Sequence, residues 1–213
     1  MAEWQDSLPL WAAGWAAVRG QTSAPEGSGV RTAPAGEHAH PEYILAWPGR
    51  DAERAAETVR QHPGSTLTLV FGEAGEALDY AAAARGLAPV ARAVLLAAPT
   101  DQLNAAPLLP ENAELAQAPL ELYDLVEISV FDHPVASGRV RIEEGLAVIG
   151  GLQTQTPDSG KGLKQAVLAA LADEAYVHGA DILYTVVGPD EVEAYIASGW
   201  TAAAHIVSLR AAS

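Results

Sequence analysis

Hydrophobic and polar positions along the chain predict strands and helices that follow one another in a repeated order. Apolar runs of strand length lie at 43–47, 66–71, 90–97, 147–152, 181–187 and 203–209. Segments of helical periodicity lie at 51–61, 75–85, 163–178 and 191–198. The alternation at 126–131 and 135–142 predicts an antiparallel hairpin. The pattern therefore predicts an α/β (α+β) chain whose mixed, mostly antiparallel sheet is flanked by helices.

The order of these elements indicates a weak internal repeat. Residues 65–98 and 181–212 both give a strand, a glycine, a helix, a glycine followed by apolar residues, and a strand. This repeat predicts two similar halves, at 1–100 and 120–213, that share a sheet or pack side by side. Residues 101–119 carry three prolines and are expected to connect the halves. The alternative is that any two strand–helix–strand units look alike at this level.

The first forty residues predict a helix followed by a loop. Trp4, Trp11 and Trp15 fall close to one face of a helix expected over 4–18. Such a face either covers the sheet as part of the core or is exposed, and exposed tryptophans would favour a homodimer. Residues 20–40 are rich in Gly, Ser, Pro and Thr, which is typical of a loop.

A glycine turn between the strand at 147–152 and the helix at 163–178 is the clearest chemical signal. It reads Ser159-Gly160-Lys161-Gly162. Such a turn directs backbone N–H groups and the positive end of the helix dipole at one point, which suits the phosphates of a ligand. Glycines allow close approach because they lack a Cβ atom. The alternative is a plain tight turn.

The surroundings of this turn resemble a known family. A glycine turn, an alanine-rich helix, the run HGADILYTVV at 178–187 and a tyrosine before Gly199-Trp200 follow in that order. In order and composition, residues 126–209 resemble the C-terminal half of the GCN5-related N-acetyltransferase (GNAT) family. The resemblance implies a twisted sheet in which the strand before the turn diverges from its neighbour to hold acetyl-CoA. The first half then resembles a degenerate copy, because Trp47-Pro48-Gly49-Arg50 stands where the double glycine would be.

The resemblance also implies roles for individual residues. The pyrophosphate of acetyl-CoA is expected to bind at the turn, which comprises Ser159, Gly160, Lys161, Gly162, Leu163 and Lys164. The pantetheine and the thioester are expected along the end of the preceding strand, at Leu152, Gln153 and Thr154. An amine would attack the thioester directly, and Tyr195 would protonate the departing thiolate. Glu127 is the first candidate for the base that accepts the proton of the amine, because its strand would neighbour the cofactor strand; Asp124 is the second.

Two departures from the family pattern keep a second function open. Ser159 replaces a basic or amide residue, and Lys164 stands where a small residue normally lets CoA approach. The connection from Gly188 to Tyr195 is also short. These features favour a catalytically inactive module that binds CoA or a protein partner. The order of elements and Tyr195 favour an N-acetyltransferase, which is our prediction.

Composition and short motifs further limit the functions that the chain can have. A net charge of −15 argues against nucleic acid. It fits a substrate that is a small-molecule amine or a protein amine, and the alternative is that the charge serves solubility alone. The chain has no cysteine, which excludes disulfides and a cysteine nucleophile. Glu37-His38-Ala39-His40 could suggest a metal site but lacks a third spaced ligand, so no metal is expected. No P-loop, dinucleotide fingerprint or nucleophile elbow is present. No apolar run approaches the length of a membrane span, and the first residues lack the charge of a signal peptide. We therefore expect a cytoplasmic protein without membrane partners.

Overall fold

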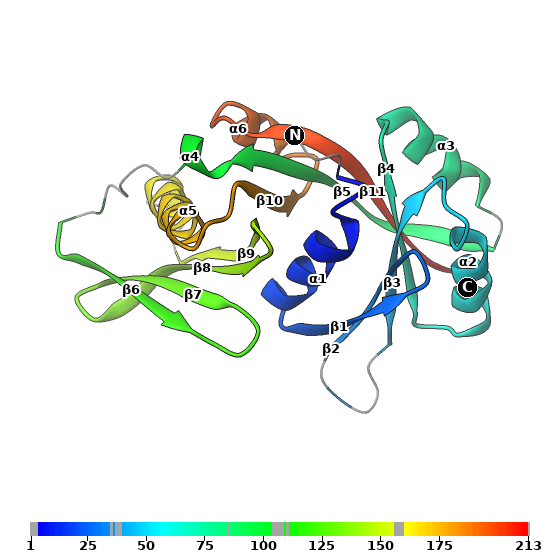
Figure 1. The fold of residues 1–213 in the computed structure, drawn as a ribbon, viewed down its shortest axis with the longest axis horizontal. Coiled ribbons are helices and arrows are strands. Elements are labelled where there is room, and N and C mark those ends of the chain that lie inside the picture. Colours follow the sequence, from blue (N-terminus) through cyan, green and yellow to red (C-terminus); the bar gives the residue numbers. More distant parts are fainter. Residues whose placement is uncertain are drawn as a thin grey trace.

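A computed structural model of the chain describes residues 4–34, 36, 40–84, 86–103, 109, 111–155 and 160–212, and of residues 82, 160 and 161 it describes the backbone alone. The described residues form one sheet of eleven strands (Figure 1). The strands are β1 Gln21–Glu26, β2 Gly29–Pro34, β3 Glu42–Trp47, β4 Thr66–Phe71, β5 Leu87–Pro99, β6 Ala113–Pro119, β7 Asp124–Val130, β8 His133–Glu143, β9 Leu146–Thr154, β10 Ile182–Val187 and β11 Thr201–Ala211. The helices are α1 Leu8–Val18, α2 Ala52–Gln61, α3 Ala74–Ala83, α4 Thr100–Leu103, α5 Gly160–Val177 and α6 Val192–Ile196.

The order of the strands confirms that two halves of similar topology share one sheet. Across the sheet the order is β1-β2-β3-β4-β11-β5-β10-β9-β8-β7-β6. In the first half β3 and β4 are parallel and joined by α2, and α3 then leads to β5. In the second half β9 and β10 are parallel and joined by α5, and α6 then leads to β11. The two series therefore mirror each other about the boundary between β5 and β11.

The last strand of each half lies next to the other half. Strand β5 follows the first-half helix α3 but pairs with β10, and β11 follows the second-half helix α6 but pairs with β4. Both pairings are antiparallel, as is the long pairing of β5 with β11, which runs from Ala97↔Thr201 to Leu87↔Ala211. The backbone hydrogen bonds of the sheet are thus continuous from one half into the other.

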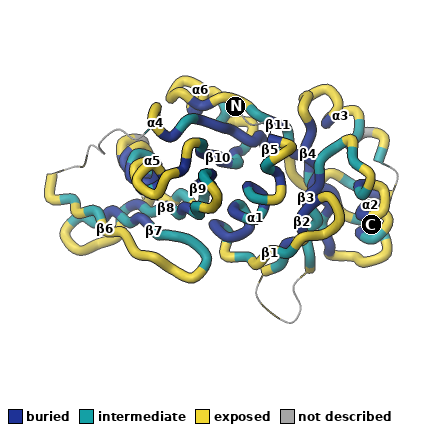
Figure 2. The backbone as a smooth tube through the Cα atoms, in the orientation of Figure 1, coloured by how far each residue is buried: buried dark blue, intermediate teal, exposed yellow. Residues whose placement is uncertain are grey.

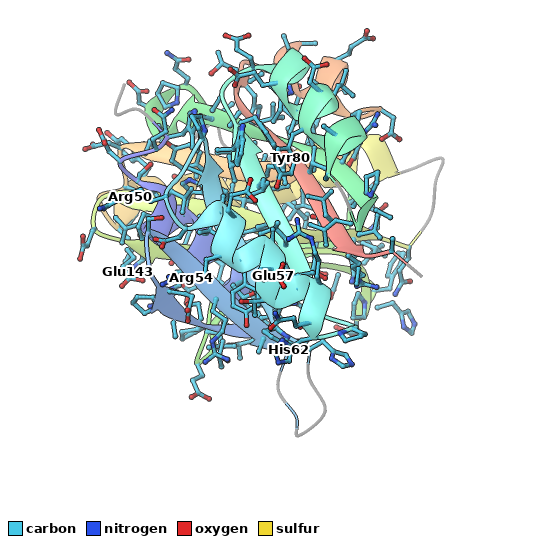
Figure 3. All side chains as sticks on the ribbon, turned by 90° about the vertical axis from the view of Figure 1, so that its right-hand side faces the viewer. Arg50, Arg54, Glu57, His62, Tyr80 and Glu143 are labelled. Atoms are coloured by element: carbon cyan, nitrogen blue, oxygen red, sulfur yellow. The ribbon has the colours of Figure 1, made fainter. Side chains whose placement is uncertain are left out.

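Helices cover both faces of the sheet, and the side chains of β5 show which helices share a face. Leu96 lies in the same buried cluster as the α5 residue Leu171, whereas its neighbour Leu95 lies in the cluster of the α1 residue Trp11. Because successive strand residues point to opposite faces, α5 and α1 cover opposite faces. Helices α2 and α3 pack over the first half on a third cluster (Figure 2). The outer face of α2 carries the exposed side chains of Arg54 and Glu57, and the exposed His62 follows its last residue (Figure 3).

Helix α1 is a core element, which confirms the first alternative for its tryptophan face, namely that it covers the sheet as part of the core. Trp11 is fully buried and Trp4 is 8% exposed, and the indole of Trp11 donates a hydrogen bond to the Trp4 carbonyl. Trp15 is half-buried, and the Arg19 guanidinium lies 3.8 Å from its ring centroid. The hydrophobic effect therefore holds this face against the sheet, and the argument for a homodimer loses its basis.

Glycines let α1 approach the sheet closely. A Cβ atom at Gly14 of α1 would lie 2.6 Å from Cγ2 of Val148, and one at Gly150 of β9 would lie 2.6 Å from Cγ2 of Val18. The C-terminal end of α1 is also held by the second half, because Arg139 of β8 donates a hydrogen bond to the Val18 carbonyl at 3.0 Å. A basic side chain at this end of a helix satisfies a free carbonyl.

Two segments differ from their sequence-based prediction. Residues 21–34, expected to be a loop, form the β1–β2 hairpin at one edge of the sheet. The expected connection 101–119 contains α4 and also β6, which adds a strand at the other edge. Edge strands are half exposed, so their composition of Ser, Thr, Gln, Glu and Pro gives no hydrophobic signal that distinguishes them from loops.

We predict that Gly14→Ala destabilises the protein. The new Cβ would also lie 3.1 Å from Cβ of the buried Val148, so the helix or the strand must shift. We expect the free energy of unfolding in urea to fall by about 1–3 kcal/mol, more than the gain in helix propensity of about 1 kcal/mol.

The matched control is Gly75→Ala in α3, where a Cβ atom would meet nothing within 4 Å. This variant is expected to keep or raise the stability. An equal gain in both variants would show that α1 is not docked against β9.

Candidate functional site

The two central parallel strands of the second half separate before their ends. Strands β9 and β10 pair from Leu146↔Ile182 to Ile149↔Thr185. Beyond Ile149, β9 continues to Thr154 along β8 alone. Backbone groups on the β10 side of this segment therefore have no strand partner, and such groups are available for a ligand.

The corresponding strands of the first half stay closed. Strands β3 and β4 pair along their whole length, ending at Trp47↔Phe71. Beyond this end, the Trp47 ring packs against Tyr80 of α3, with 4.5 Å between ring centroids. The Phe71 ring is 5.8 Å from the same tyrosine. Three aromatic side chains thus fill the first half at the position where the second half is open.

A β-bulge turns the free end of β9. Its register with β8 shifts between the pairs Arg139↔Gly150 and Ser137↔Gln153, and Gly151 within the shift has a positive φ of 61°. After the bulge, the Gln155 amide donates to a β8 carbonyl at 2.9 Å. Backbone amides point alternately to the two sides of a strand, so the backbone N–H of Gln153 also points to β8. The backbone N–H of Thr154 points to the opposite side, from which β10 has diverged.

Leu152 points to the face that α5 covers. A Cβ atom at Gly138 of β8 would lie 2.8 Å from Cδ2 of Leu152 and 2.6 Å from Cγ1 of Val167. The predicted thioester strand is thus positioned by packing between Gly138 and α5.

The predicted glycine turn is the first turn of α5. The helix begins at Gly160, so Gly160, Lys161, Gly162 and Leu163 provide amides with no partner within the helix. Ser159, the first residue of the predicted phosphate-binding segment, lies outside the described residues. A helix N-terminus is favourable for an anion because the free amides and the helix dipole act together.

Lys164 links α5 to the start of α6. Its Nζ donates a hydrogen bond to Glu191 at 2.6 Å and lies 5.0 Å from the ring centroid of Tyr195. The side chains of Lys164 and Glu191 are 34% and 45% exposed. Burial acts to lower the pKa of Lys164, but the hydrogen bond to Glu191 and the neighbouring Tyr195 outweigh it, so this pKa is raised and the amine stays charged.

Tyr195 is both packed and close to an open space. Its side chain is 5% exposed, and its ring meets that of Trp200 edge to face at 5.7 Å. Burial raises the pKa of Tyr195 above its usual value, which Lys164 opposes and Glu191 reinforces. The phenol is therefore protonated at neutral pH. Tyr195 therefore lies beside Lys164 of α5 with the short connection from Gly188 in place.

A mostly apolar cavity of about 320 Å³ lies between α5 and α6. It is lined by Lys164, Gln165, Leu168, Ala194, Tyr195 and Ser198. An apolar channel with a cation at its side fits a flexible arm that ends in phosphate groups.

Glu127 lies in a different cavity, on the other face of the sheet. Its neighbours Val126 and Ile128 belong to the cluster that packs against α5, so Glu127 points away from α5. With Pro134, Val135, Ala136, Ser137, Gln153, Thr154 and Gln155 it lines a polar cavity of about 250 Å³. Asp124, the second candidate base, does not line this cavity.

The structure thus groups the predicted residues into two sets. Lys164 and Tyr195 line the apolar cavity between α5 and α6. Glu127, Gln153 and Thr154 line the polar cavity on the other face of the sheet. No described residue lines both cavities. Sequence reasoning missed Glu191 as a site residue, because its only signal was its position at the start of a short helix.

The described residues contain neither a candidate metal cluster nor a candidate membrane-spanning helix. Its His, Asp and Glu residues form no group of three that could hold a metal ion. No helix within the same residues has the length and apolar character that a membrane crossing requires.

Comparisons with known proteins identify the fold. The sequence matches no family model and no curated protein. Among solved structures, a GCN5-related N-acetyltransferase from Kribbella flavida covers 100% of this chain and 97% of its own, with a TM-score of 0.70 at 18% identity. A GNAT-family protein from Novosphingobium aromaticivorans covers 96% of this chain and 99% of its own, with a TM-score of 0.60 at 15% identity.

A third solved structure is a tandem GNAT protein from the clavulanic acid biosynthesis pathway. It covers 98% of this chain and 93% of its own, with a TM-score of 0.59 at 16% identity. The chain therefore has the GNAT fold, and the two halves of its sheet agree with a tandem arrangement. At these identities the likeness extends to the fold alone.

We predict that Glu191→Gln lowers the apparent pKa of Tyr195. The change removes a negative charge that raises this pKa and leaves the Lys164 ammonium beside the phenol. Ultraviolet titration of tyrosine, with Glu191→Gln/Tyr195→Phe as the blank, measures the shift. An unchanged titration curve would show that the three side chains do not interact in solution.

Proposed function

We propose that this chain is an acyl-CoA-dependent N-acetyltransferase whose donor site lies in the second half, between β9, α5 and α6. The observation that carries the proposal is the divergence of β9 from β10 beside the start of α5, at the point where the first half is closed by Trp47 and Phe71. Strand β9 leads to the N-terminus of α5, and Lys164 and Leu168 further along the same helix line the apolar cavity. These are the features that a thioester on a long phosphate-bearing arm requires.

Each part of acetyl-CoA has a counterpart among these residues. The free amides of the first turn of α5 would bind the pyrophosphate, and Lys164 would add a positive charge. The pantetheine would lie against the unpaired side of β9. The Thr154 amide is directed to that side and is a donor for either an amide of the pantetheine or the thioester carbonyl.

The proposed reaction is a direct transfer. The neutral amine attacks the thioester carbon, the new C–N bond forms and the C–S bond breaks. Tyr195, kept protonated by burial, donates its proton to the departing thiolate. An ordered water accepts the proton that the amine loses.

The contact between Lys164 and Glu191 favours a second candidate function. It joins α5 to α6 beside the cavity, so a ligand phosphate must compete with Glu191 for the ammonium. A GNAT-fold module that binds CoA without turnover, or that binds a protein partner, is consistent with that contact. Calorimetry with acetyl-CoA and CoA, followed by an amine screen, separates the two: binding without turnover indicates the module.

We predict that acetyl-CoA binds and stabilises the protein. At a ligand concentration a hundred times the dissociation constant, the free energy of unfolding should rise by about 2.7 kcal/mol. Tyr195→Phe should bind acetyl-CoA with unchanged affinity and lower kcat by about a hundredfold or more, because only proton transfer is removed. A variant with full kcat would exclude Tyr195 as the acid, and no binding at millimolar ligand would exclude the proposed function.

We predict that Lys164→Met weakens acetyl-CoA binding about tenfold, because a charged contact to phosphate is lost. Binding of S-acetylpantetheine, which has no phosphate, should be unchanged, and this ligand is the control. Calorimetry with both ligands measures the difference. An equal loss for both ligands would indicate that Lys164 acts through packing on Tyr195 and not through phosphate.

A further inference from the structure

A row of polar side chains crosses three strands in the polar cavity, on the face of the sheet that α1 also covers. Glu127 of β7 pairs with Ser137 of β8, and Ser137 pairs with Gln153 of β9. Paired residues of neighbouring antiparallel strands point to the same face, so the three side chains stand side by side. All three line the cavity of about 250 Å³. The row ends on the part of β9 that has separated from β10.

The carboxylate and the neutral polar side chains of this row are suited to bind a cation. Glu127 is half-buried, and among the described residues that line the cavity it is the only charged one. Within the described part of the chain, Glu127 has no hydrogen-bond or ion-pair partner. The nearest cationic residue along β8 is Arg139. Its guanidinium donates a hydrogen bond to the Val18 carbonyl and lies 4.6 Å from the ring centroid of Tyr123. A carboxylate accepts hydrogen bonds only, and an ammonium group offers three donors.

Strand β8 separates Glu127 on β7 from the open side of β9, so Glu127 does not adjoin the position proposed for the reacting amine. Neighbouring strands lie about 4.8 Å apart, so two spacings separate β7 from β9 by roughly 10 Å. A general base must come within hydrogen-bonding distance of the proton that it removes, or act through one water. An amine that reacts beside β9 therefore leaves Glu127 free to hold a second group of the same molecule.

We infer that the acceptor is a dication, in which Glu127 holds one ammonium group while a second amine, roughly 10 Å away, reacts beside β9. This inference rests on the proposed acetyl transfer. It names a substrate class that the transfer alone does not specify. Ser137 and Gln153 line the path between the two nitrogens and offer hydrogen bonds along it. The net charge of −15 adds a long-range attraction for such a molecule.

The experiment compares two acceptors of equal length, diaminooctane and octylamine. Diaminooctane should show a KM at least about tenfold lower, because only it places an ammonium on Glu127. Glu127→Gln should raise the KM for diaminooctane to that of octylamine, leave kcat within twofold and leave octylamine unchanged. The control is Glu114→Gln on β6, which removes the same charge outside the cavity and should change neither substrate.

The outcomes separate this inference from the proposed function. Equal KM values for the two amines would overturn the inference while acetyl transfer stands. A fall in kcat for both amines in Glu127→Gln would also overturn it, because a base acts on every acceptor. If no acetyl-CoA binds, the proposed function fails by itself. Calorimetry of diaminooctane with wild type and Glu127→Gln then still decides whether Glu127 holds an ammonium group.

Discussion

The antiparallel pairing of β5 with β11 is the interaction on which the rest of the molecule depends. Each strand ends one half of the chain but completes the sheet of the other. In the core, β5 contributes Leu95 to the cluster under α1 and Leu96 to the cluster under α5. Similarly, β11 contributes Ile206 to the α1 cluster and Leu209 to the cluster under α2. Neither half can bury its own core without a strand that continues from the other.

This exchange gives the closed first half a role in the site. Tyr195 lies on α6, and the chain passes through Trp200 directly into β11, whose far end is buried beside β4. The position of the tyrosine against α5 is thus fixed by a strand anchored in the first half. From the other face, α1 covers β9 where it begins to diverge, through the close contact of Gly150 with Val18. The first half, which has no opening of its own, therefore holds two sides of the opening in the second half.

The sequence predicted the elements that are buried on both faces better than those at the edges. The predicted limits of β3, β4 and β10 differ from the observed limits by at most one residue, because continuous apolar runs mark buried parallel strands. The β1–β2 hairpin and β6 were missed because half-exposed edges carry polar residues and proline. The divergence of β9 was implied only by resemblance, since Gly150-Gly151 alone does not distinguish a bulge from a flexible turn.

Pairwise geometry was the part of the site that sequence could not provide. Lys164 and Glu191 are 27 positions apart, and their contact depends on how α5 and α6 pack on the sheet. Glu127 was chosen because its strand would neighbour β9, but β8 lies between them, and this order follows from the two hairpins of the second half. A shift by one strand changes the role that a carboxylate can have, from contact with the reacting atoms to contact with a distant part of the substrate.

The Lys164–Glu191 contact connects the start of α5 with α6, the helix that carries Tyr195. A lysine at the start of a helix is unfavourable for the helix dipole unless an anion is near, and Glu191 supplies that anion from the start of α6. A bound phosphate would take the same position and offer more negative charge than one carboxylate. Ligand binding would then release Glu191 from α5 while keeping Lys164 charged. Because Glu191 raises the pKa of Tyr195 and Lys164 lowers it, such an exchange changes the proton affinity of the phenol when the donor substrate binds.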